Sequence, residues 1–204
     1  MTLRGRFLSG LPFPLDPFQT EALDALDRGH SVLVSAPTGS GKTLIAAYGV
    51  VRALASGGKA FYTTPLKALS NQKFKELGAE HGADRVGLLT GDTAIRPDAP
   101  VVVMTTEVLR NMLLAGSDLL AGLQTVVLDE VHYLQDPYRG AVWEEVLVLC
   151  PPEVVFVCLS ATVNNALELG GWLRSVRGPT EVVVERHRPI TLRHHVAVHR
   201  REDA

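Results

Sequence analysis

The sequence predicts an α/β fold in which a mainly parallel sheet of about seven strands has helices on both faces. Two observations support this class. Short runs rich in β-branched residues alternate with segments of helical spacing along most of the chain, and inner runs such as residues 101–104 are apolar at every position. A strand with one solvated face would alternate in polarity, so we expect the inner strands to be buried on both faces.

Turn and cap residues bound the elements in the first half of the chain. Residues 1–15 contain several glycines and prolines, and we expect an irregular lead-in there. Asp16 and Pro17 suit the N-cap and the first position of a helix that ends at Gly29. The patterns that follow predict a strand at 31–35, a helix at 42–55, a strand at 59–63, a helix at 66–77 and a strand at 86–89.

The same alternation continues in the second half. Residues 91–100 are rich in turn formers and predict a loop, after which 101–104 forms a strand and Thr105 or Thr106 caps a helix. The remaining predictions are a strand at 125–128, a helix at 139–149, a strand at 154–159, a helix at 164–175, a strand at 181–184 and an extended exit segment at 190–198.

Composition excludes several classes of protein. Of the 204 residues, 46% are hydrophobic and 21% are charged, which is enough for a core and argues against disorder. The net charge of −2 gives no overall attraction to a polyanion, so a nucleic-acid surface would have to be a local patch. No apolar stretch reaches about 18 residues, so we expect a soluble, cytoplasmic protein without membrane contact.

The cysteines and histidines predict no metal site. Cys150 and Cys158 lie in apolar surroundings at a spacing that fits no common metal pattern, so we expect buried free thiols, in keeping with a reducing cytosol. Along an extended segment His194 would face away from its neighbour His195, so we expect a solvated tail. The four histidines near the end of the chain are His187, His194, His195 and His199.

A phosphate-binding loop is the strongest functional signal. Residues 36–43 read Ala-Pro-Thr-Gly-Ser-Gly-Lys-Thr and lie between an apolar strand and a segment of helical spacing. That context is what a G-x-x-x-x-G-K-[ST] motif requires, although Ala36 stands in place of the first glycine. The loop residues expected to surround the phosphates are Thr38, Gly39, Ser40 and Gly41.

Four side chains near this loop carry the predicted chemistry of ATP and Mg²⁺. Lys42 would reach the β- and γ-phosphates, and the Thr43 hydroxyl would bind Mg²⁺. A further apolar strand ends at Asp129 and Glu130, and the carboxyl ends of parallel strands share one edge of a sheet. Asp129 can hold Mg²⁺ there through water, while Glu130 can polarise the water that attacks the γ-phosphate.

Together these motifs resemble those of the first RecA-like domain of superfamily 2 helicases of the DExH type. The closer similarity is to the superkiller-type RNA helicases, which include the exosome-associated ones. Besides the phosphate loop, the resemblance rests on the stretches 13–19, 64–72, 104–110, 129–145 and 159–172, and it covers residues 11–195. It implies a three-layer α/β/α RecA-like domain at 16–188, a lead-in at 1–15, and an exit at 189–204 toward a second RecA-like domain.

The resemblance also implies roles for individual residues. Gln19 would read the adenine edge, and Phe13 would stack on the purine or anchor the core. Ser160 and Thr162 would couple the nucleotide state to strand grip or form a plain turn, and His132 would bridge to the partner domain or be a polar turn residue. The residues implied to hold a nucleic-acid strand are Pro65, Leu66, Lys67, Thr90, Gly91, Thr105 and Thr106.

Three functions remain open at this point. The resemblance favours the ATP-binding domain of an RNA helicase, but a DNA-directed superfamily 2 helicase and a non-catalytic ATP-responsive nucleic-acid-binding module are alternatives. The family's second domain supplies arginine fingers from a motif like Gln-x-x-Gly-Arg-x-Gly-Arg, which this sequence does not contain. We therefore expect a monomeric domain that binds ATP–Mg²⁺ weakly, hydrolyses it poorly and does not unwind on its own.

Overall fold

A single eight-stranded sheet organises the computed structural model, which describes residues 1–136, 138, 140–162 and 165–188. The strand order is β4-β3-β5-β2-β6-β7-β1-β8. Seven strands run parallel, and the short β4 pairs antiparallel with β3 at one edge. The predicted parallel sheet is therefore confirmed. The strands are β1 (Ser31–Ser35), β2 (Lys59–Thr64), β3 (Val86–Leu89), β4 (Ala94–Ile95), β5 (Val101–Thr105), β6 (Leu123–Leu128), β7 (Val155–Ser160) and β8 (Thr180–Val184).

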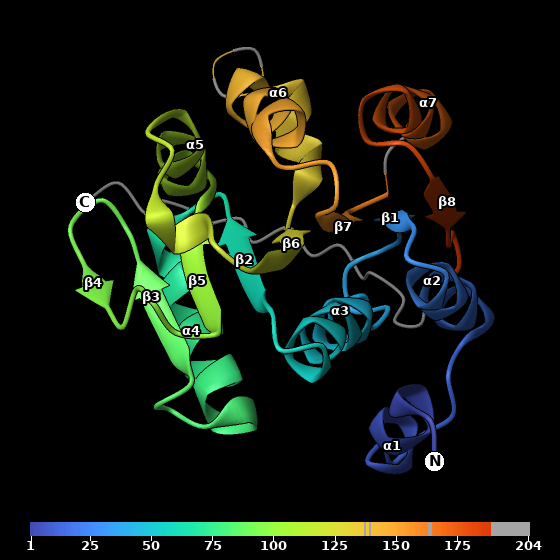
Figure 1. Cartoon of the computed structure of the whole chain (residues 1–204). Coiled ribbons are helices and arrows are strands. Elements are labelled where there is room, and N and C mark those ends of the chain that lie inside the picture. The colour runs from blue at the N-terminus through green and yellow to red at the C-terminus, as the bar shows by residue number, and fades with distance from the viewer. Residues whose placement is uncertain (137, 139, 163–164, 189–204) are drawn as a thin grey trace, which may run out of the picture.

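Helices cover both faces of the sheet and complete the three layers (Figure 1). On one face α2, α3 and α4 enclose a core that includes Leu23, Ile45 and Leu77, and on the other α5, α6 and α7 enclose a core around Trp143. The α-helices are α1 (Leu3–Ser9), α2 (Pro17–Asp27), α3 (Thr43–Ala55), α4 (Lys67–His81), α5 (Thr106–Leu114), α6 (Gly140–Leu149) and α7 (Ala166–Arg177), with short 3₁₀ turns η1 (Asp118–Leu120) and η2 (Val131–Gln135).

Within the lead-in, α1 corrects the sequence prediction. Residues 1–15 were expected to be irregular, but the Thr2 hydroxyl accepts a hydrogen bond from Gly5 N and so caps a helix there. Tertiary contacts then hold it: the ring of Phe7 lies 5.1 Å from that of Tyr48, and Arg4 pairs with Asp24 and Asp27 of α2. A seven-residue helix is marginal alone, which is why packing rather than local pattern determines it.

Between residues 91 and 100 the structure again differs from the expected loop, because Ala94 and Ile95 form β4. The partner strand permits this through Gly87, where a Cβ atom would lie 2.1 Å from Arg96 O. At the start of α5 the N-cap position belongs to Thr105, yet neither expected cap acts through its side chain, since Thr105 makes no capping hydrogen bond and Thr106 is already helical.

The strand order places the candidate site residues at one edge. Because β7 lies between β6 and β1, the segments that follow these three strands are neighbours at the carboxyl edge of the sheet. Ala36 N donates to Ser160 O at 3.2 Å, so the phosphate loop begins in contact with the end of β7. The extended exit segment expected at 190–198 lies outside the described residues, and so do His194, His195 and His199.

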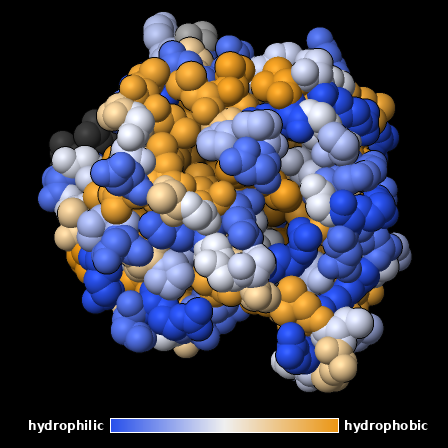
Figure 2. Space-filling model, in the orientation of Figure 1, coloured by the Kyte–Doolittle hydropathy of each residue, from blue (hydrophilic) through white to orange (hydrophobic). Residues whose placement is uncertain are grey.

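Hydrophobic side chains also reach the surface over the helices of one face. Figure 2 shows them gathered toward the top of the molecule, over α5 and α6, where Leu114 and Val148 are exposed. In the part of the chain that the structure describes, no helix is both long and apolar enough to cross a membrane. Cys150 and Cys158 are buried and free, as predicted, and burial raises the pKa of each thiol to about 12, so both stay protonated at neutral pH.

Candidate functional site

The phosphate loop links β1 to α3 with the geometry that its sequence predicts. Gly39 and Gly41 adopt φ values of +83° and +85°, a region that other residues rarely occupy. A Cβ atom on Gly41 would also lie 2.7 Å from Gln19 Nε2, so this glycine is required for space as well as for backbone conformation. The Ser40 hydroxyl is buried and has no hydrogen-bond partner among the described residues, which leaves it available to a ligand.

Gln19 braces the loop. Its Oε1 accepts from Asp16 N at 2.9 Å, and its Nε2 donates to Gly41 O at 3.2 Å, so the side chain ties α2 to the phosphate loop. Only 3% of Gln19 is exposed. One amide hydrogen and one acceptor lone pair remain for the adenine contact that the resemblance implies.

A hollow of about 360 Å³ joins these residues to Phe13. Phe13 is 53% exposed and therefore presents its ring to the hollow, a finding that favours purine stacking over the alternative of a core anchor. The hollow is lined by Phe13, Asp16, Gln19, Gly39, Ser40, Gly41 and Leu44. A neighbouring hollow shares Asp16 and Ser40 with it and adds Glu185, which the sequence did not single out, and His187, which was expected in a solvated tail.

Lys42 folds back over the loop that precedes it. Its Nζ donates to Ala36 O at 2.5 Å and to Pro37 O at 3.0 Å, so the ammonium is held where phosphate oxygens would approach. Burial lowers the pKa of Lys42, and the negative charges of Glu130 and Asp129 partly offset that change. Both carboxylates are therefore near enough to Lys42 for their charges to act on the ammonium.

The Asp129 carboxylate is held by hydrogen bonds to both oxygens. Oδ1 accepts from Glu130 N at 3.0 Å, and Oδ2 accepts from the Tyr62 hydroxyl at 2.9 Å. Burial, followed by the charge of Asp129, raises the pKa of Tyr62 well above its ordinary value, so this phenol stays a donor. Tyr62 could not be identified from the sequence pattern, because 67 residues separate it from its partner.

Glu130 follows in a left-handed backbone conformation, with φ +55° and ψ 43°. A non-glycine residue rarely occupies this region, and such strain is common at functional sites. His132 Nδ1 lies 3.3 Å from Glu130 Oε2, so the predicted coupling histidine sits beside the predicted water-polarising carboxylate. The residues after β6 therefore form a compact charged turn.

Ser160 is the last residue of β7, the strand that lies between β1, which leads into the phosphate loop, and β6, which leads to Asp129. Its hydroxyl is fully buried and, among the described residues, has no hydrogen-bond partner. Ser35 Oγ donates to Ala161 O at 3.3 Å, which fastens this segment to the strand that leads into the phosphate loop. Thr162 is exposed and lies one residue before a gap in the described chain.

The residues fit ATP and Mg²⁺. The Thr43 hydroxyl and the Asp129 carboxylate offer oxygen ligands of the kind that Mg²⁺ prefers. The buried hydroxyls of Ser40 and Ser160 need a partner that the described residues do not supply, and a bound nucleotide with its water shell would provide one.

A separate hollow of about 370 Å³ is lined by most of the residues expected to hold a nucleic-acid strand. It lies where β2 and β5 end and α4 and α5 begin, so two helix N-termini face it. Lys67 is its cation and lies 3.0 Å from Asp92. The lining residues are Pro65, Leu66, Lys67, Gly91, Thr105, Glu107, Val108 and Asn111, of which Val108 and Asn111 were not predicted.

Two of the expected strand-binding side chains face the protein instead. Thr106 is fully buried, and its hydroxyl lies 3.5 Å from Thr64 O, so its side chain holds α5 against β2. Thr90 is largely buried and its hydroxyl donates to Asp92 Oδ1 at 2.9 Å. Neither residue lines the hollow.

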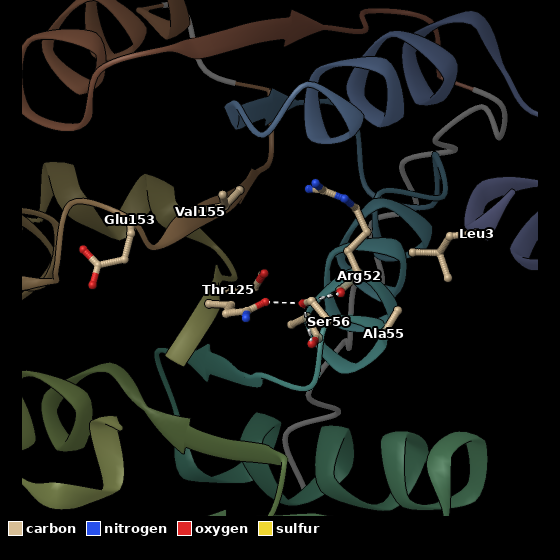
Figure 3. A pocket seen from close by; sticks show the side chains of 9 residues that line it. Leu3, Arg52, Ala55, Ser56, Thr125, Glu153 and Val155 are labelled. Atoms are coloured by element: carbon tan, nitrogen blue, oxygen red, sulfur yellow. Dashed lines mark hydrogen bonds between the residues drawn. The ribbon is translucent and has the colours of Figure 1, made fainter. Parts of the chain in front are cut away.

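One further hollow, of about 360 Å³, lies at the opposite edge of the sheet (Figure 3). It is bordered by the last turn of α3, including Arg52 and Ser56, and by the first residues of β6 and β7. None of the predicted site residues lines it, so we assign it no part in nucleotide binding.

The sequence matches the DEAD/DEAH box helicase family over residues 16–169. It is 60% identical to the probable helicase HelY of Mycobacterium leprae and 54% identical to the chloroplastic DExH-box ATP-dependent RNA helicase DExH15 of Arabidopsis thaliana; these alignments cover 96% and 88% of this chain. The chain spans only 21% and 16% of the length of those relatives.

A solved structure shares the fold. The helicase Lhr of Mycobacterium smegmatis, bound to single-stranded DNA and AMP-PNP, superposes with a TM-score of 0.69 at 30% identity, over 90% of this chain and 27% of that one. Its likeness agrees with the observed three layers and the parallel sheet. On the extent of the family match and the geometry of the site, this chain belongs to the DEAD/DEAH box helicase family.

Proposed function

We propose that this chain is the ATP-binding first RecA-like domain of an ATP-dependent RNA helicase of the DExH type. The observation that carries the proposal is that the phosphate loop with Lys42 follows β1 and the Asp129–Glu130 turn follows β6, so both lie at the carboxyl edge of the sheet with only β7 between them. Residues 16–188 would form the domain, and residues 189–204 would lead toward a second RecA-like domain. ATP and Mg²⁺ would bind at this edge, and a single strand would cross the hollow at Lys67.

The superkiller-type assignment rests on the stretches at 64–72 and 104–110, which supply most of the residues that line the hollow at Lys67. The name of the Arabidopsis relative supports RNA as the substrate. The alternative of a DNA-directed helicase has support in the Lhr structure, which contains single-stranded DNA. We propose a monomeric domain, and a cytoplasmic location because Cys150 and Cys158 are free thiols.

Low turnover is expected of the 204-residue chain alone. A transition-state arginine contributes ~10³–10⁵ in rate to P-loop hydrolysis, and the motif that would supply it is not in this sequence. Steady-state release of phosphate, measured with saturating RNA, should therefore stay far below ~1 s⁻¹. Turnover of that order by the purified chain would show that hydrolysis does not need arginine fingers from a second domain.

Strand preference separates the two helicase alternatives. With an ATP analogue and Mg²⁺ present, we expect a single-stranded RNA to bind more tightly than DNA of the same sequence, because the 2′-OH can be read directly. Fluorescence anisotropy at several salt concentrations would measure this. Lys67→Ala should reduce the salt dependence by about 0.7 in log–log slope, since one phosphate contact is lost. Equal or tighter DNA binding would favour the DNA-directed alternative.

A further inference from the structure

The feature that carries a further inference is the buried contact between Tyr62 and Asp129. The register of the sheet produces it: Tyr62 pairs with Val127 across β2 and β6, and Asp129 lies two residues beyond on the same side of the chain. Asp129 N donates to Thr63 O at 3.0 Å, so the pairing extends past the end of β6 and fixes the backbone of the aspartate.

With the backbone fixed, the orientation of the carboxylate depends on its two donors. Glu130 N holds Oδ1, but it lies on the adjacent residue and anchors only one of the two oxygens. The Tyr62 hydroxyl reaches over from a neighbouring strand and anchors the other oxygen, Oδ2. Each oxygen keeps a lone pair for a water or a metal.

Tyr62 itself has little room to move. Only 1% of the residue is exposed, and its ring packs in the core between the sheet and α4. Lys73 Nζ lies 5.4 Å from the centre of the ring and 2.6 Å from Glu76, so α4 closes over the phenol with a paired cation. The hydroxyl is therefore delivered to Asp129 by a rigid support.

We infer that Tyr62 is a positioning residue for the metal-binding carboxylate, and that its hydroxyl sets how strongly Mg²⁺ strengthens nucleotide binding. The inference rests on the proposed function, since it takes Asp129 as a ligand of the nucleotide's Mg²⁺, directly or through water. Groups that orient metal ligands in this way typically change metal affinity by about 10–100-fold when they are removed. Tyr62 would act in the same way from the neighbouring strand.

The test is the Mg²⁺ dependence of ATP binding to Tyr62→Phe, followed by isothermal titration calorimetry. The change removes one oxygen and keeps the ring in the core, so the fold is retained, and thermal unfolding checks this. We expect ATP affinity in EDTA to stay within about twofold, whereas the Mg²⁺ concentration that gives half of the tightening should rise about tenfold.

Tyr48→Phe is a matched control. Tyr48 is equally buried, and its hydroxyl donates to a carboxylate too, Asp27 Oδ1 at 2.5 Å, but this pair joins α3 to α2 away from the metal site. It should leave the Mg²⁺ dependence unchanged. A double-mutant cycle adds a second check: in an Asp129→Ala background, Tyr62→Phe should cause no further loss.

The outcomes separate the inference from the proposed function. If the unmodified chain shows no strengthening of ATP binding by Mg²⁺, both the function and the role of Tyr62 fail. If the chain shows it and Tyr62→Phe retains it in full, the role of Tyr62 fails while the function stands. An equal loss in EDTA and in Mg²⁺ would also overturn the role, because a general structural defect predicts that result.

Discussion

Replacement of Lys42 with alanine is expected to weaken binding of ATP–Mg²⁺ to this chain about 100-fold. The ammonium lies between the carbonyl oxygens of Ala36 and Pro37, and a bound nucleotide would replace these with phosphate oxygens. Charge-assisted hydrogen bonds of this kind contribute about 1.5–3 kcal/mol each, and an uncompensated phosphate charge adds to the loss. Calorimetric titration with ATP in excess Mg²⁺ measures the change.

Lys67→Ala is the control for this experiment. Lys67 is also a lysine beside an acidic partner, Asp92 at 3.0 Å, but it lines the hollow of Pro65 and Asn111 rather than that of the phosphate loop. Its loss should change ATP affinity by less than about twofold, since surface ion pairs contribute little. A Lys42→Ala chain that still binds ATP like the unmodified protein would show that residues 36–43 are not the phosphate site.

The phosphate loop could be predicted because its chemistry is local. A tight turn around an anion needs residues such as Gly39 and Gly41, whose positive φ values follow from the loop itself. Asp129 and Glu130 could be placed for a similar reason, because a parallel sheet brings the ends of its strands to one edge whatever their order. Motif and topology together therefore predicted that these residues lie at one edge of the sheet.

The residues that hold the site residues in place by hydrogen bonds could not be predicted in the same way. Tyr62 reaches Asp129 only through the pairing of β2 with β6, and a buried tyrosine in an apolar strand has the pattern of an ordinary core residue. Gln19 shows the same limit, since the resemblance implies a contact with adenine and gives no sign of the hydrogen bond to Gly41 O. Such contacts join residues far apart in the chain.

For the residues expected to hold a nucleic-acid strand, the sequence predicted where several of them lie but not where their side chains point. Pro65, Leu66 and Lys67 line one hollow, yet the hydroxyl of Thr106 turns to Thr64 O and that of Thr90 to Asp92. A short polar side chain at a strand end can satisfy its own backbone or neighbour instead of a ligand. Packing determines which partner such a side chain takes, just as packing determines that α1 forms.

A second large effect is expected from Arg177, which the sequence did not mark. Its guanidinium donates four hydrogen bonds to main-chain carbonyls of the last turn of α6 and of the segment that joins α6 to β7, and it stacks on Phe156 with 4.8 Å between the guanidinium carbon and the ring centre. Burial lowers the pKa of Arg177, the charge of Glu153 partly offsets that change, and the carbonyl dipoles at the end of α6 face the cation. The carbonyls belong to Leu147, Cys150, Pro151 and Val154.

Arg177→Ala should therefore lower the free energy of unfolding by about 3 kcal/mol, because several carbonyls lose a charged donor at once. Urea denaturation followed by circular dichroism measures this. Arg174→Ala is the matched control on the same helix: Arg174 is exposed and donates one hydrogen bond, to Thr180 O at 2.7 Å, so its loss should cost about 1 kcal/mol. Arg177→Lys should fall between the two, since an ammonium lacks the planar fork that reaches four acceptors. Equal losses for the two alanine variants would mean that the carbonyls around Arg177 find water instead, and that the end of α6 does not depend on this arginine.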